Sequence, residues 1–345
     1  MIRKPLRLVV LTTNRCTARC THCVMNASPD RHDHLTFEQI RSVIDSLCEF
    51  SKPRMVVFSG GEPLLLGDDL LNAIAYVDGL GIRTRVVTNC YWAVSSKIAK
   101  EKLVELRESG LQQLVISTDD EHQHYVIFEQ VKYAWQASKG LGFQSVAIAN
   151  SSLPDSRITP DFIMEHLGEE IRLLYDKNRR HQTLKKSEDG TIYFLSNSNV
   201  QHLGRAKEYI DRDKVRYVTK RFEGGCQNVL RDPALSPTGH LVGCCGMEVE
   251  SNSVLYMGDT SIDTAANIIV RADENIMLNA IALLGPLFLK HFIEHHAPEV
   301  SFYERYATFC QLCEHIVNRP TTVKVLLDNI AELSGIVLDK RRRLG

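Results

Sequence analysis

The chain has 345 residues, of which 44% are hydrophobic, so it can build one large domain or two medium ones. Its formal net charge of −1 gives no electrostatic reason to expect a nucleic-acid partner. Neither a signal peptide nor an apolar run approaching ~20 residues is present, so we expect no membrane association. Ten cysteines without a secretory signal predict metal ligation in a reducing cytoplasm rather than disulfides.

The first predicted element is a short strand at residues 6–11 (LRLVVL), a continuous apolar run typical of a buried strand. Directly after it, Cys16, Cys20 and Cys23 form a C-x3-C-x2-C run. Three thiolates this close can hold three irons of a cubane [4Fe–4S] cluster and leave the fourth iron open. A zinc site is the alternative, although zinc usually takes four nitrogen or sulfur ligands.

The segments that follow alternate between helix-like and strand-like patterns. A capping box at Thr36 and Gln39 begins a helix whose apolar residues run to Leu47. Further strands are expected at 55–58, 83–87, 114–116, 145–149 and 191–195, and further helices at 70–80, 95–109, 128–139 and after Pro160. Alternating strands and helices give a parallel sheet, and six such units in roughly 200 residues predict a partial (β/α)6 TIM-like barrel in the α/β class.

Polar motifs follow three of these strands at their C-terminal ends. They are Gly60-Gly61-Glu62-Pro63, Thr88-Asn89 and Ser117-Thr118-Asp119. Because barrels of this kind place their chemistry at that edge of the sheet, we expect the motifs to lie close to the cysteine run.

The pattern changes near Cys226, which predicts a barrel domain at 1–222 and a smaller second domain at 223–345. Residues 233–242 are expected to form a hairpin that turns at Pro237-Thr238-Gly239. Residues 267–290 are expected to be helical, with a break at Gly285-Pro286.

Together, the cysteine run and the strand-end motifs resemble the radical SAM superfamily over residues 6 to about 150. In that superfamily, S-adenosylmethionine (SAM) chelates the open iron, and one electron from the cluster yields a 5′-deoxyadenosyl radical. The resemblance implies that Gly60, Gly61 and Glu62 hold the methionyl amine of SAM. The other implied contacts are those of Asn89 and Ser117 with the ribose or carboxylate, of Asp119 with the ribose hydroxyls, and of the backbone around Ile148 with adenine.

The C-terminal cysteines also resemble an element of this superfamily. Cys226 and Cys244, with Gly239 between them, resemble the C-x(9–15)-G-x4-C element of SPASM and twitch extensions. With Cys310 and Cys313 they complete four thiolates, which implies a closed auxiliary [4Fe–4S] cluster in a C-terminal iron–sulfur domain. A structural zinc ion with the same four ligands is the alternative.

One further cysteine, Cys245, adjoins this predicted cluster. Since an S–H bond is weaker than a typical C–H bond, its thiol is a candidate hydrogen-atom donor to a carbon radical. Cys245 could instead be buried filler, or it could replace Cys244 as a ligand.

A looser resemblance concerns the reaction. The Cys244-Cys245 pair, the Ser117-x-Asp119-x-x-His122 motif and the segments Asn26-Ala27-Ser28-Pro29 and Tyr91-Trp92-Ala93 resemble epipeptide-type radical SAM peptide epimerases. This implies that an L-residue of a ribosomally made precursor peptide loses its α-hydrogen and regains one from Cys245 on the opposite face. SAM would be the cosubstrate, and a flavodoxin- or ferredoxin-type protein the reductant.

Two other functions fit the same residues. The first is a radical SAM enzyme that forms a thioether or carbon–carbon crosslink, or that dehydrogenates a peptide or an antibiotic-type small molecule. The second is a zinc-binding interaction protein without enzymatic activity. Product mass separates the first from epimerisation, and bound zinc without iron would identify the second.

Overall fold

The computed structural model describes residues 4–175, 181–215, 222–244 and 252–344. These residues contain one nine-stranded sheet in the order β6-β5-β4-β3-β2-β1-β7-β8-β9. The parallel strands are β1 (Arg7–Leu11), β2 (Met55–Ser59), β3 (Arg83–Thr88), β4 (Gln113–Ser117), β5 (Ser145–Ser152) and β6 (Ile192–Asn199). Each pairs in parallel with its neighbour in sequence, which confirms the predicted partial barrel.

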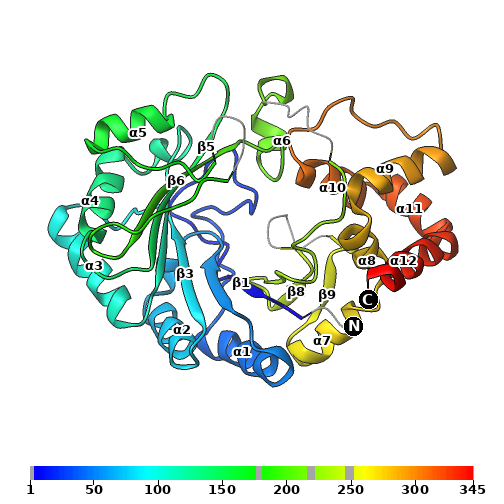
Figure 1. Cartoon of the computed structure of the whole chain (residues 1–345), viewed down its shortest axis with the longest axis horizontal. Helices are drawn as coiled ribbons and strands as arrows, with labels where there is room; N and C mark the ends of the chain where they lie inside the picture. Colours follow the sequence, from blue (N-terminus) through cyan, green and yellow to red (C-terminus); the bar gives the residue numbers. More distant parts are fainter. Residues whose placement is uncertain (1–3, 176–180, 216–221, 245–251, 345) are drawn as a thin grey trace.

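Helices cover the outer face of these strands (Figure 1). They are α1 (Phe37–Ser51), α2 (Asp68–Gly79), α3 (Ser96–Glu108), α4 (Phe128–Ser138) and α5 (Pro160–Leu167). The predicted capping box is present: Thr36 Oγ1 accepts from the Gln39 backbone N–H (3.3 Å), and the Thr36 N–H donates to Gln39 Oε1 (2.9 Å). After β6 the sixth unit is reduced to one turn, α6 (Ala206–Tyr209).

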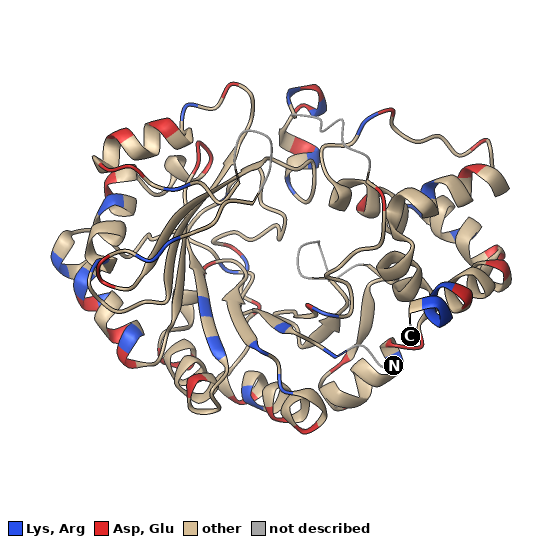
Figure 2. Cartoon of the chain, viewed as in Figure 1, with Lys and Arg blue, Asp and Glu red and all other residues tan. Residues whose placement is uncertain are grey.

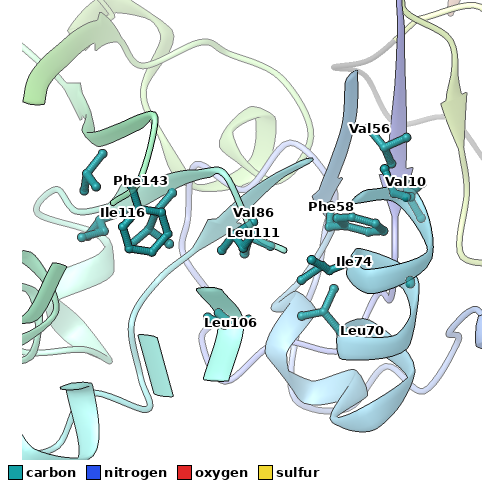
Figure 3. Packing of buried hydrophobic residues seen from close by; sticks show 14 of the residues in the cluster. Val10, Val56, Phe58, Leu70, Ile74, Val86, Leu106, Leu111, Ile116 and Phe143 are labelled. Carbon is teal, nitrogen blue, oxygen red and sulfur yellow. The ribbon is translucent and has the colours of Figure 1, made fainter. Parts of the chain in front are cut away.

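Strands β1 and β2 are apolar on both faces because each face meets its own core. In β1, Leu8 and Val10 belong to the core between the sheet and the helices, whereas Val9 and Leu11 face a smaller cluster on the inner side. This follows from the period of two along a strand. Figure 3 shows the helix-side core, where the Phe58 ring of β2 lies toward Ile74 of α2.

The C-terminal part of the chain extends the same sheet. Strand β7 (Ala234–Leu235) pairs in parallel with β1, Val9 lying opposite Ala234. Strand β8 (His240–Val242) then pairs antiparallel with β7, which confirms the predicted hairpin, and β9 (Tyr256–Asp259) follows. The sheet therefore continues across the predicted boundary between residues 222 and 223.

Beyond the sheet the chain is helical. The helices are α7 (Ala265–Ala272), α8 (Ile276–Leu283), α9 (Gly285–His296), α10 (Phe309–Val317), α11 (Pro320–Asp328) and α12 (Ile330–Leu344). The break predicted at Gly285 is present, but the sequence analysis missed the earlier break, where the Asn275 side chain caps α8 by accepting from the Leu278 N–H (3.1 Å). In the described part of the chain, a membrane-spanning length of apolar helix is reached only by joining α8 and α9, which meet at a bend of 114°.

The ring of Phe58 provides a test of the helix-side core. Phe58→Ala should lower the free energy of unfolding by about 3–5 kcal/mol, because the ring is fully buried and its removal leaves a cavity. Denaturant unfolding measures the change. Ile262→Ala is the control: its side chain is 83% exposed, so the change should stay below about 0.5 kcal/mol. Equal losses in the two variants would contradict this account of the core.

Candidate functional site

A cavity of about 330 Å³ lies at the C-terminal ends of the barrel strands. The predicted site residues that line it are Cys16, Cys20, Cys23, Gly60, Gly61, Asn89 and Ser117. The structure thus brings the cysteine run and three strand-end motifs to one place, as the rule for parallel barrels leads one to expect. Glu62, Asp119 and Ile148 do not line the cavity.

The three thiols of the cysteine run are close enough to influence one another. Burial raises the pKa of Cys16 to about 12, and the charge of Cys23 adds to the shift. Burial also raises the pKa of Cys20, together with Asp119 and the two other thiols. Thiolates at the buried Cys20 and the half-buried Cys16 and Cys23 therefore need a positively charged partner, which the irons of a cluster supply. The donor set fits a cluster held by three cysteines.

Hydrogen-bond donors surround the Cys16 sulfur. The Ala18 N–H donates to Cys16 Sγ (3.4 Å), and the Asn89 side-chain amide donates to the same sulfur (3.7 Å) and to Thr17 Oγ1 (3.1 Å). Donors to a ligating sulfur reduce its negative charge and so tune the reduction potential of a cluster. Asn89, predicted to contact SAM, therefore also contacts the first cysteine.

Two glycines allow the cysteine loop to lie against the end of β2. A Cβ at Gly61 would lie 2.1 Å from the Arg15 carbonyl oxygen, and one at Gly60 would lie 2.7 Å from that of Thr13. Gly60 also has a φ of 120°, which L side chains rarely adopt. The Gly61 N–H donates to the Thr13 carbonyl (2.6 Å), so the two segments are joined by a backbone hydrogen bond.

Glu62 is fully buried and does not line the cavity. Its carboxylate accepts from Thr88 Oγ1 (2.9 Å), the Asn89 N–H (2.9 Å) and the Leu64 N–H (3.2 Å). Burial raises the pKa of Glu62 to about 7, although these three donors favour the charged form. Glu62 ties the end of β2 to the end of β3. A carboxylate can accept a fourth hydrogen bond, so the contact with the SAM amine stays a prediction.

Asp119 bridges two histidines that line the cavity. Its Oδ2 lies 2.9 Å from His22 Nε2, and its Oδ1 lies 2.8 Å from His122 Nδ1. Burial opposes the charged form of Asp119, but the attraction of His122 and His22 holds its pKa well below the usual range. Because His22 lies between Cys20 and Cys23, this carboxylate anchors the cysteine loop to the end of β4. The predicted ribose contact would compete with these bonds.

Ile148, around whose backbone the adenine contact is predicted, does not line the cavity. The Ile148 side chain is fully buried in the helix-side core, and its strand pairs with β4 and β6 on both sides. Farther along the same strands, Ser151 and Ser198 line the cavity, with their hydroxyl oxygens 3.1 Å apart. The sequence analysis missed these serines because serines at a strand end carry no distinctive spacing.

Arg205 is another residue that the sequence analysis missed. Its guanidinium donates to the carbonyls of Cys20 (2.8 Å) and Ala27 (2.7 Å), and its backbone N–H donates to the Cys23 carbonyl (3.0 Å). The preceding Gly204 lies so close that a Cβ there would be 2.5 Å from the Cys23 carbonyl oxygen. The segment after β6 therefore also holds the cysteine loop, through residues other than those that contact Gly60 and Gly61.

The predicted auxiliary ligands also come together. Burial raises the pKa of Cys313 well above its usual value, and Cys244, Cys310 and Cys226 add to the shift, which places all four thiols near one another. Cys310 and Cys313 lie in the first turns of α10, whose N-cap Thr308 accepts from the Gln311 N–H (3.1 Å). A helix N-terminus favours thiolates.

A close backbone contact at Gly225 positions Cys226, the first of these cysteines. The Cys226 N–H donates to the Ile281 carbonyl (2.9 Å), and a Cβ at Gly225 would lie 2.1 Å from the Ala282 carbonyl oxygen. The chain before Cys226 therefore packs directly on the end of α8. The predicted hydrogen donor, Cys245, lies outside the described residues.

Sequence comparison identifies the first part of the chain. A sequence model of the radical SAM superfamily matches residues 10–135, the segment that carries the cysteine run and the motifs after β2, β3 and β4. Over these residues the chain is therefore similar to radical SAM domains. Such a domain implies a [4Fe–4S] cluster and SAM, in agreement with the donor set described above.

Curated relatives match a part of the chain of similar length. The chain is 31% identical over 137 residues to Fe-coproporphyrin III synthase of Methanosarcina barkeri (strain Fusaro / DSM 804), covering 39% of this chain and 32% of that protein. It is 29% identical over 117 residues to GTP 3′,8-cyclase of Rhodopirellula baltica (strain DSM 10527 / NCIMB 13988 / SH1), covering 32% and 31%. The matches span about a third of these relatives.

One solved structure shares the fold over nearly the whole chain. The structure of native anSMEcpe with bound AdoMet and Cp18Cys peptide covers 97% of this chain and 99% of that protein, with a TM-score of 0.53. The sequence identity is 12%, so this likeness concerns the fold alone. It extends the comparison beyond the radical SAM domain to the C-terminal helices.

Arg205 offers a test of how the cysteine loop is held. Arg205→Gln should make an anaerobically reconstituted N-terminal cluster lose iron to a chelator about tenfold faster, because charge-assisted bonds to two loop carbonyls are lost. The decay of the iron–sulfur absorbance measures the rate. Arg172→Gln is the matched control, since Arg172 also donates to a carbonyl, that of Thr183, outside the cavity. Equal rates in both variants would contradict the role of Arg205.

Proposed function

We propose that the chain is a radical SAM enzyme that converts an L-residue of a ribosomally made peptide into the D-form. The observation that carries the proposal is the cavity at the strand ends, which is lined by all three cysteines of the run within a radical SAM domain. When bound, the reduced cluster and SAM would supply a 5′-deoxyadenosyl radical that removes an α-hydrogen from the peptide.

Residues of this chain would organise that chemistry. Cys16, Cys20 and Cys23 would ligate three irons, and Asn89 would donate a hydrogen bond to the first sulfur. The backbone of Gly60 and Gly61 and the Ser117 side chain would form the SAM-binding wall, since all three line the cavity. Glu62, Asp119 and the backbone near Ile148 would contact SAM after a local rearrangement of the site.

Hydrogen return is assigned to Cys245. Its S–H bond would break, and the hydrogen atom would form a new C–H bond on the opposite face of the peptide radical. One electron and one proton, the electron coming from a flavodoxin- or ferredoxin-type protein, would restore the thiol. The neighbouring Cys244 would ligate the auxiliary [4Fe–4S] cluster with Cys226, Cys310 and Cys313, a set whose members approach one another.

Two further points support a peptide substrate in a reducing compartment. The fold-related anSMEcpe structure contains a bound peptide, which shows that this fold can receive one. Ten cysteines in a single chain are compatible with a reducing, cytoplasmic setting. We propose residues 1–222 as the radical SAM barrel and residues 223–345 as the auxiliary-cluster domain, although one sheet joins them.

Iron content tests the two-cluster arrangement. Anaerobically reconstituted protein should hold about eight irons per chain, and Cys313→Ala and Cys20→Ala should each hold about four. Each variant removes a buried ligand from one of the two sets, so each serves as the control for the other. Zinc bound at the four-cysteine set, with four irons at the N-terminal set, would support the structural-zinc alternative instead.

Deuterium incorporation tests the epimerase reaction. The protein should be incubated without air in heavy water with SAM, a reductant and peptides encoded beside its gene. One deuterium should enter one α-carbon, because the Cys245 thiol exchanges with solvent, and Cys245→Ala should abolish this without loss of iron. Cys48→Ala, in α1 outside the cavity, should behave as wild type.

Chiral amino-acid analysis determines the configuration of the modified residue, and mass spectrometry determines the mass of the product. Apart from the deuterium, epimerisation leaves the peptide mass unchanged. Loss of two hydrogens would instead favour the crosslinking or dehydrogenating enzyme, and a D-residue free of deuterium would contradict return from Cys245. Failure to convert SAM into methionine and 5′-deoxyadenosine would overturn the whole proposal.

A further inference from the structure

A second cavity lies at the opposite edge of the barrel sheet, where the strands begin. Its volume is about 350 Å³. The charged residues that line it are Arg7, Arg54, Arg83, Arg85, Arg231 and Asp232. Figure 2 shows basic positions along β3, whose N-terminal half contributes two of them. Five guanidinium groups thus meet one carboxylate around a single hollow, in a chain whose net charge is −1.

The strand register brings these arginines together. Arg7 lies opposite Met55 in β2, Met55 lies opposite Arg83 in β3, and Arg54 directly precedes β2. Arg83, Arg85 and Val87 are two residues apart along β3, so their side chains lie on the same face of the strand. Val87 lines the first cavity, the one that contains the cysteine run. The arginine cavity is therefore separated from the cysteine cavity by the apolar cluster on the inner face of the sheet.

The positive charge in this cavity is incompletely compensated by the described residues. Arg7 pairs with Asp232. Arg85 donates through Nε (2.9 Å) and Nη2 (2.5 Å) to Gln113 Oε1, which is a neutral acceptor, and Arg83 donates through Nε to the Arg54 carbonyl (3.4 Å).

The pKa of Arg85 reflects repulsion among these positive charges. Burial lowers the pKa of Arg85, and the neighbouring charges of Arg7 and Arg83 lower it further. Holding like charges together around one hollow costs free energy, which an anion bound among them would recover. Arginine suits this task, because its planar fork donates two parallel hydrogen bonds to phosphate or carboxylate oxygens.

We propose that this cavity binds a small multivalent oxyanion of the phosphate or pyrophosphate class, either free or as part of a larger metabolite. The volume is within the range of small-molecule sites, and the lining is polar and basic. The site is independent of the radical reaction, because the apolar inner cluster lies between the two cavities.

Calorimetric titration of the full-length protein with pyrophosphate, at constant ionic strength, tests this proposal. Wild type should bind one pyrophosphate saturably, and Arg85→Gln and Arg231→Gln should each weaken binding about tenfold. Arg231 is exposed, so its variant keeps the test valid if replacing the half-buried Arg85 disturbs folding. Arg172→Gln, outside this cavity, is the control and should bind as wild type does.

Further arms of the titration separate the sources of the anion. Competition by ADP would show that a phosphate-bearing metabolite can occupy the site, whereas competition by inorganic phosphate alone would identify the free ion. The proposal is overturned if wild type shows no saturable binding, or if all variants bind equally. It is also overturned if a polyglutamate peptide binds and pyrophosphate does not, since the cavity would then be a surface for an acidic protein.

Discussion

The loop that carries Cys16, Cys20 and Cys23 lies directly on the backbone of Gly60 and Gly61, and the geometry of the cavity at the strand ends depends on this contact. A Cβ at Gly61 would overlap the Arg15 carbonyl oxygen, so side chains larger than hydrogen would displace the loop. The contact places the three thiols at the strand ends, beside the motifs from β3 and β4. Binding and reaction would both begin from this placement.

Buried acids and one arginine complete the support of the loop. Glu62 accepts a hydrogen bond from the Asn89 N–H at the end of β3. Asp119, at the end of β4, forms a hydrogen bond with His22. Arg205 reaches the carbonyl of Cys20 from the segment after β6. Each of these three charged side chains forms hydrogen bonds to a nearby strand or to the loop. The loop is thus held by three separate segments, as the precise positioning of a reactive centre requires.

The C-terminal part is joined to the barrel by main-chain pairing as well as by side-chain packing. Strand β7 adds to β1, so the segment that leads to Cys244 continues from the same sheet that supports the cysteine loop. A shared sheet is stiffer than a flexible linker between domains. It would hold the two proposed clusters at a constant separation, which electron transfer and hydrogen return across one substrate both need.

The sequence by itself determined the elements that depend on neighbouring residues. These elements are local patterns, and each was found where it was predicted: the apolar run of β1, the Thr36 capping box, the cysteine run and the glycines after β2. Contacts between distant segments were decided by the tertiary structure alone. Arg205 lies 185 residues from Cys20, the partners of Glu62 and Asp119 are set by the chain path, and β7 pairs with β1 across the predicted domain boundary. Local propensity carries no information about such contacts, because they form only when packing of the whole sheet brings the segments together.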